Sequence, residues 1–182
     1  MTSSMQGKTV LITGANSGIG KETAVALARV GATVVFTARD PEKGEQAAAD
    51  IRRRSGADVT LMPLDLASFP SIRHLADGFL QRYDERHVLT NNAGVLRPTP
   101  VFDIEEEEWD MVVNGNLKST YLCSRAVLPA MRDQGWGRIV NFSSREPVPA
   151  GTLVDVDIHG ATPHSLLGEV PVKRTNLELP CI

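Results

Sequence analysis

A glycine-rich segment near the amino end constrains this chain more than any other feature. Residues 13–20 read Thr-Gly-Ala-Asn-Ser-Gly-Ile-Gly and are called the glycine turn below. An apolar run (10–12) precedes the turn, apolar positions with helical spacing follow it (24–31), and a second apolar run covers 33–36. In a unit of strand, glycine turn, helix and strand, the turn and the helix N-terminus bind phosphate. The residues assigned to this contact are Gly14, Asn16, Ser17, Gly18, Ile19 and Gly20.

Strand and helix patterns continue to alternate as far as Phe142. Further strand patterns cover 59–62, 88–90 and 138–142. Helical patterns cover 41–54, 72–83 and about 105–132. Ser68 is a candidate N-cap for the second of these helices. This alternation predicts an α/β fold: a Rossmann-type, doubly wound parallel sheet of about five recognisable strands with helices on both faces. The ligand is expected beyond the carboxyl ends of the strands, where the strand order reverses.

Composition narrows the classes of partner. The 182 residues suit one domain, and a net charge of −3 with a pI near 5.8 argues against nucleic acid and anionic membranes as partners. No apolar run is long enough to span a membrane, and the first six residues lack the regions of a signal peptide. With only two cysteines, Cys123 and Cys181, we expect a reduced, cytoplasmic protein. No residue is assigned to a metal site.

The composition of the sequence changes at Arg145. The last 38 residues hold five of the eleven prolines and no aromatic residue. Only the stretch 152–158 has a strand-like pattern there. We therefore expect a nucleotide-binding domain over residues 6–144, followed by an atypical proline-rich tail over 145–182. The sheet is expected to be incomplete on its C-terminal side.

Five motifs, in order and at suitable spacing, resemble those of the short-chain dehydrogenase/reductase family. They are Thr13-x-x-x-Gly18-x-Gly20, Asp65-Leu66, the Asn-Asn-Ala-Gly of 91–94, Asn116 within Asn-Leu-Lys, and the serine pair 143–144. The resemblance covers roughly residues 6–144. The first half is most similar to the retinol-dehydrogenase-like branch and the stretch 109–144 to acyl-carrier-protein reductases, so the branch stays open.

The resemblance implies a dinucleotide site. Asp65 and Leu66 would lie at the adenine, with a turn or an N-cap as the alternative role of Asp65. Three residues would line the ribose and nicotinamide: Asn92, Ala93 and Gly94; the alternative is an ordinary asparagine–glycine turn. The end of the second strand carries Ala38 and Arg39 instead of an acid, which favours NADP(H) over NAD(H), because a guanidinium grips a phosphate. A surface arginine at the start of a turn is the alternative.

The catalytic pattern is incomplete. Ser144 and Asn116 match the family's serine and asparagine, although a strand end and a helix bend would also explain them. The tyrosine and lysine are expected at positions 157 and 161, which hold Asp157 and Ala161, and no tyrosine follows Tyr121. We interpret Tyr121 as a buried core residue. His159 and His164 are alternative proton donors, although histidines in such a tail are more often surface residues.

The resemblance implies an NADP(H)-dependent oxidoreductase that transfers hydride between an alcohol and a carbonyl. We expect it to be impaired, because a Tyr-x-x-x-Lys segment is absent. The alternatives are a non-catalytic NADP(H)-binding or partner-binding protein, and a fragment without a function of its own. A deletion, a shifted reading frame or an alternative exon would each account for the tail. The sequence decides neither the small-molecule substrate nor the oligomeric state.

Overall fold

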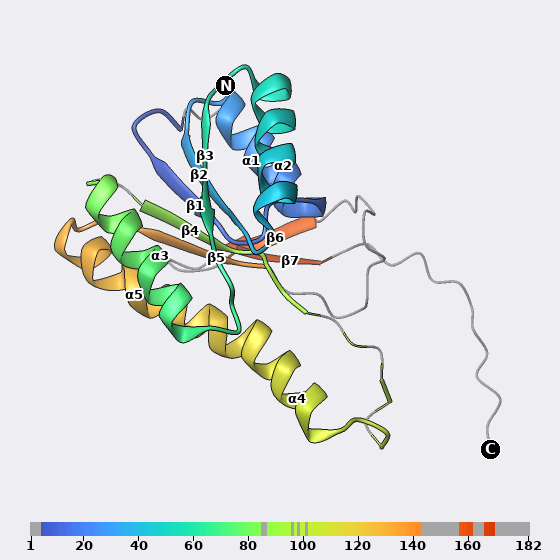
Figure 1. The fold of residues 1–182 in the computed structure, drawn as a ribbon. Helices are drawn as coiled ribbons and strands as arrows, with labels where there is room; N and C mark the ends of the chain where they lie inside the picture. Colours follow the sequence, from blue (N-terminus) through green and yellow to red (C-terminus); the bar gives the residue numbers. More distant parts are fainter. Residues whose placement is uncertain are drawn as a thin grey trace.

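A five-stranded parallel sheet forms the centre of the molecule (Figure 1). In the computed structural model the described residues are 5–84, 87–95, 97, 99–100, 102–142, 157–161 and 166–169. The strands are β1 (Thr9–Ile12), β2 (Thr33–Ala38), β3 (Val59–Pro63), β4 (His87–Asn91) and β5 (Arg138–Asn141), in the order β3-β2-β1-β4-β5. Every pairing between neighbours is parallel, which confirms the predicted Rossmann-type sheet.

Helices cover both faces of this sheet. They are α1 (Gly18–Arg29), α2 (Pro41–Ser55), α3 (Phe69–Arg82) and α5 (Ser119–Asp133). A further helix, α4 (Glu106–Val113), extends beyond the sheet and has no buried residue (Figure 1). Alternate residues of β1 point to opposite faces, so Val10 and Ile12 pack in the core with α1 and α2, whereas Leu11 packs in the core with α3 and α5. Figure 1 shows α1 and α2 on one side of the strands and α3 and α5 on the other. The molecule therefore has three layers.

The switch in strand order lies between β1 and β4. The chain runs outward from β1 to β2 and β3, then returns to the other side of β1 to form β4 and β5. The loops after β1 and β4 consequently leave the sheet side by side at its carboxyl edge, because Ile12 pairs in register with Thr90. This is the place where open α/β sheets bind their ligands.

The long helical stretch expected over 105–132 is interrupted in the structure. A π-helical turn, η1 (Asn114–Lys118), joins α4 to α5. Such a turn accommodates one extra residue without breaking the helix, and it is common at functional sites. Asn116 lies within η1, which agrees with the alternative that this residue bends its helix.

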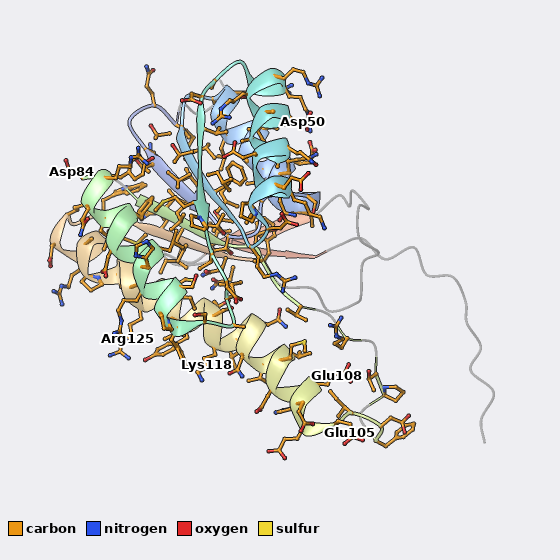
Figure 2. The ribbon with its side chains drawn as sticks, in the orientation of Figure 1. Asp50, Asp84, Glu105, Glu108, Lys118 and Arg125 are labelled. Carbon is orange, nitrogen blue, oxygen red and sulfur yellow. The ribbon has the colours of Figure 1, made fainter. Side chains whose placement is uncertain are left out.

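Tyr121 corrects one expectation. The sequence predicts a core residue here, but 55% of Tyr121 is exposed. The buried positions of α5 are Ser119, Cys123, Val127 and Met131, whose spacing of four residues marks one face. Tyr121 lies two residues from Cys123, on the opposite face, where Arg125 donates a hydrogen bond to the Tyr121 hydroxyl at 3.1 Å. Figure 2 shows Arg125 extending from α5 away from the sheet.

Two short strands lie in the C-terminal region. β6 (Asp157–Ala161) and β7 (Leu166–Glu169) pair antiparallel in a separate two-stranded sheet. The strand expected near 152–158 overlaps β6 at residues 157–158, and positions 152–156 lie outside the described residues. β7 was not expected from the sequence. No helix among the described residues is long and apolar enough to span a membrane.

Candidate cofactor site

Thr13 joins the glycine turn to the loop after β4. Its side chain is buried, and its hydroxyl oxygen accepts hydrogen bonds from the backbone N–H groups of Asn92 (3.0 Å) and Ala93 (3.1 Å). The same hydroxyl donates to the carbonyl of Thr90 at 3.4 Å. One threonine thus fixes the backbone of residues 92 and 93, which sequence reasoning placed at the cofactor.

Asn92 holds the turn in return. Its side-chain nitrogen donates to the carbonyl oxygens of Thr13 and Gly14, both at 2.9 Å. The two donor hydrogens of the amide are therefore bound to the glycine turn, and the amide oxygen is the group left for a ligand. In the structure these bonds brace the turn, and the contact of Asn92 with a cofactor stays a prediction.

Glycines are required where the two loops meet. A Cβ atom on Gly14 would lie 2.6 Å from the Ala93 Cβ, and one on Gly20 would meet the Asn92 amide and lie 2.9 Å from the Gly14 carbonyl oxygen. Gly14 also has a φ of +67° and Gly18 a φ of +59°, which side chains disfavour. A Cβ on Gly18 would meet no atom within 4 Å, so the turn is open on that side. The backbone is therefore accessible to a phosphate there.

The N-terminus of α1 differs from those of its neighbours. Asp40 caps α2 by accepting from the N–H groups of Glu42 and Lys43, and Ser68 caps α3 by accepting from the N–H of Ser71, as predicted. Ser17, the N-cap of α1, makes no such side-chain bond. Since the first N–H groups of a helix lack partners within the helix, those of α1 are suited to hold an anion.

Arg39 follows the end of β2 at the same edge of the sheet. Ala38 is buried, whereas Arg39 is exposed and makes no hydrogen bond or ion pair with any residue that the structure describes. The adjacent carboxylate of Asp40 is bound to the N-terminus of α2. At this edge, Arg39 is therefore a cation without a hydrogen bond or ion pair to the described part of the chain, and the carboxylate next to it in the sequence already has partners.

Asp65 follows β3 and forms a turn of its own. Its carboxylate accepts from the N–H of Ala67 at 3.0 Å, and its N–H donates to the hydroxyl of Ser71 at 2.9 Å. The turn role considered for this residue is thus present in the structure. The second carboxylate oxygen of Asp65 makes no hydrogen bond to the described residues. Leu66, the next residue in the chain, is half-buried.

Asn116 reaches from η1 to the loop after β4. Its side-chain nitrogen donates to the carbonyls of Val95 (2.7 Å) and Val112 (2.8 Å), and its oxygen accepts from the Val95 N–H at 3.0 Å. Gly94 lies against the same amide, because a Cβ there would come within 2.5 Å of the Asn116 oxygen. The structure therefore brings Asn116 to the predicted cofactor loop, with its amide bound to backbone.

The remaining catalytic candidates are placed only in part. Ser144 and His164 lie outside the described residues. Positions 157 and 161, where the tyrosine and lysine were sought, belong to strand β6, as does His159. A Tyr-x-x-x-Lys pair relies on a helix to bring residues four apart onto one face, and β6 is not a helix.

Two polar residues at this edge were given no role in the site from the sequence, although Asn91 belongs to one of the five motifs. The side-chain nitrogen of Asn91 donates to the oxygens of Asn141 (2.8 Å) and Ser124 (3.2 Å), which ties β4 to β5 and to α5. The hydroxyl of Thr37 accepts from the N–H of Gly14 at 3.2 Å. The available clue was a polar side chain within or at the end of a buried strand.

Comparison with known proteins identifies the family of this chain. The family model described as short chain dehydrogenase matches residues 8–152. The chain belongs to the short-chain dehydrogenase/reductase family. The reductase-like and retinol-dehydrogenase-like resemblances of the sequence both find counterparts. The chain is 37% identical over 141 residues to the 3-oxoacyl-acyl-carrier-protein reductase FabG of Pseudomonas aeruginosa, and 40% identical over 144 residues to human retinol dehydrogenase 11.

Solved structures of family members share the fold. A metagenomic short-chain oxidoreductase in complex with NADP is 37% identical, with a TM-score of 0.72 over 80% of this chain and 67% of that one. The chain spans about half the length of the curated relatives: its matches cover 78% of this chain but 57% of FabG, and 79% of this chain but 45% of retinol dehydrogenase 11.

Proposed function

We propose that this short-chain dehydrogenase/reductase polypeptide binds NADP(H) at the carboxyl edge of its sheet. The observation that carries the proposal is the mutual bonding of the two loops: Thr13 holds residues 92 and 93, and Asn92 holds the turn. This pairing keeps the turn open beside the uncapped N-terminus of α1, which suits a pyrophosphate. Such a pre-formed site avoids the cost of ordering loops on binding.

The choice of NADP(H) over NAD(H) rests on Arg39. Its guanidinium is exposed and free of protein partners among the described residues, and it would pair with the 2′-phosphate of NADP(H). NAD-preferring sites of this type place an acid near this position to bind the ribose hydroxyls. Here Ala38 stands at the strand end and Asp40 is bound to α2. The NADP complex of a family member with the same fold supports this choice.

The chemistry proposed for the site is hydride transfer between an alcohol and a carbonyl of a small molecule, in a cytoplasmic setting. When bound, the nicotinamide supplies the hydride acceptor or donor. The chain contributes Asn116 and Ser144 at family positions, but its 182 residues hold no Tyr-x-x-x-Lys. A positioned general acid or base typically contributes about 10²–10⁴-fold to the rate, so turnover is expected to be slow by that factor.

A second candidate is a non-catalytic NADP(H)-binding protein. The strand conformation of 157–161, where the family's tyrosine and lysine would be sought, favours it. Fluorescence titration with NADPH and NADH, followed by turnover assays on a panel of aldehydes and ketones, separates the candidates. Saturable NADPH binding with slow turnover supports the impaired enzyme, and binding without turnover supports the second candidate. No binding of either dinucleotide overturns both proposals.

A further inference from the structure

The glycine turn has a second anchor besides the loop after β4. Thr37 lies near the end of β2 and is only 1% exposed. Its hydroxyl oxygen accepts a hydrogen bond from the N–H of Gly14 at 3.2 Å. We propose that Thr37 is a positioning residue for dinucleotide binding, which acts by fixing the first peptide group of the turn. This inference rests on the proposed cofactor site and assigns to it a residue outside the family motifs found in the sequence.

The two polar groups of Gly14 are held from opposite sides. Its N–H is bound to Thr37 of β2, and its carbonyl is bound to the Asn92 side chain beyond β4. The backbone carbonyl of Thr37 also accepts from the N–H of Ala15 at 3.2 Å. Two consecutive N–H groups of the turn are therefore fixed by one residue. Neither bond depends on the loop after β4.

Burial shows why this residue carries a hydroxyl. Residues 34–38 of β2 are all buried, and valine or phenylalanine occupies the three positions before Thr37. Valine has nearly the shape of threonine and would satisfy packing at such a position without introducing a polar atom. A buried hydroxyl without a partner is costly, so its presence is explained by the bond to Gly14.

Loss of this bond should affect the ligand more than the fold. Gly14 has a φ of +67°, a conformation that glycine leaves readily because it has no Cβ. Without the Thr37 hydroxyl, the Gly14 peptide would lose the partner on its N–H side, and the exposed residues 17–19 would sample more orientations. Binding a pyrophosphate would then include the cost of ordering them.

Thr37 also precedes Arg39 by two residues, yet the two have different expected effects. The turn would hold the pyrophosphate, which NADPH and NADH share, whereas Arg39 would hold only the 2′-phosphate. Thr37→Val should therefore weaken both dinucleotides by the same factor, about tenfold. Thr37→Ser keeps the hydroxyl and should restore the affinity for both. A role in packing alone predicts the reverse, because valine fills the space of threonine whereas serine lacks the methyl group.

The test uses the full chain with Thr37→Val, Thr37→Ser and the control Thr9→Val, which alters a buried threonine in β1 at the far end of the sheet. Fluorescence titration gives the dissociation constants for NADPH and NADH. Hydrogen exchange without a dinucleotide reports the Gly14 amide, which should exchange at least about tenfold faster in Thr37→Val than in Thr37→Ser.

The outcomes distinguish a failure of the proposed role of Thr37 from a failure of the proposed cofactor site. Equal weakening of both dinucleotides in Thr37→Val, with rescue by Thr37→Ser and no change in Thr9→Val, supports the proposal. Wild-type affinity or unchanged Gly14 exchange in Thr37→Val overturns the role of Thr37 and leaves the proposed function standing. If the wild-type chain binds neither dinucleotide, the proposed function fails and the role of Thr37 in binding fails with it.

Discussion

The side-chain amide of Asn116 binds both backbone groups of Val95. It donates to the Val95 carbonyl at 2.7 Å and accepts from the Val95 N–H at 3.0 Å, with a further bond to the Val112 carbonyl. A π-helical turn on one side of the sheet is thereby joined to the loop after β4. Asn116 acts here as a clamp on the backbone that follows Gly94.

Asn116→Ala should destabilise the protein and loosen this loop. The change leaves the N–H and carbonyl of the half-buried Val95 without their side-chain partner, and the loss of a hydrogen bond costs about 0.5–1.5 kcal/mol. Urea denaturation should show a loss of that size, accompanied by weaker NADPH binding. Asn114→Ala is the matched control, since Asn114 is a half-buried asparagine in the same turn. Equal stability of the two variants would contradict the clamp.

Gly20→Ala and Gly78→Ala form a matched pair of helical substitutions. In Gly20→Ala the new methyl group would meet the Asn92 amide and the Gly14 carbonyl. In Gly78→Ala it would meet only the flexible end of Met62, at 3.3 Å. Alanine is favoured over glycine in helices by about 1 kcal/mol, so Gly78→Ala should be neutral or stabilising.

Gly20→Ala should instead lower the free energy of unfolding by about 1–3 kcal/mol, the usual cost of overpacking. It should also weaken NADPH binding, since Asn92 must shift away from the turn. Thermal melts and fluorescence titrations on both variants measure this. A Gly20→Ala protein as stable as Gly78→Ala would show that Asn92 does not depend on this close approach.

The sheet and its helices could be predicted because their patterns are local. The apolar runs of β1 and β2, the helical spacing of α1 and the N-cap Ser68 each involve residues near one another in the sequence. The alternation of strands with helices then fixes a parallel sheet, and a parallel sheet places the strand-end loops at one edge.

The hydrogen bonds within the site could not be predicted from such patterns. Asn92 bonds to a carbonyl 79 residues earlier, and Thr37 bonds to an amide 23 residues earlier, so neither contact leaves a periodic trace. The exposure of Tyr121 was missed for a related reason. The helical pattern located α5, but the choice of which face is buried depends on contacts with β4 and α3.

Because Cys123 is buried, we expect the free energy of unfolding to fall at high pH. Burial raises the pKa of this thiol from 9.0 to about 11. The folded state therefore retains its proton to a higher pH than the unfolded state does. The stability that results is fully present below pH 9 and is lost as the pH rises from 9 to 11, at up to about 1.4 kcal/mol per pH unit.

Urea denaturation of the wild type and of Cys123→Ala between pH 8 and 10.5 measures this effect. Cys123→Ala lacks the buried thiol and should show the shallower loss of stability in this range, whatever its stability at pH 8. Because both proteins retain Cys181, other titrating groups contribute equally. Parallel curves would show that the Cys123 thiol is accessible to water in the folded state.

Arg39→Ala should weaken the binding of NADPH and leave the binding of NADH unchanged. The exposed guanidinium makes no hydrogen bond or ion pair with the described residues, so its loss should leave the free energy of unfolding unchanged within about 0.5 kcal/mol. NADPH affinity should fall about tenfold or more, because a charge-assisted bond to phosphate contributes about 1.5–3 kcal/mol. NADH affinity should stay constant, because NADH lacks the 2′-phosphate.

Two further variants sharpen this test. Arg39→Lys retains the charge but not the paired N–H donors of a guanidinium, so its NADPH affinity should lie between those of the wild type and Arg39→Ala. Arg73→Ala removes an exposed arginine from α3, on the other face of the sheet, and should change neither affinity. Because total charge is the same in Arg73→Ala and Arg39→Ala, a loss confined to Arg39→Ala reports position and not net charge. An equal fall in NADH and NADPH affinity in Arg39→Ala would instead place Arg39 at the pyrophosphate and remove the argument for NADP(H).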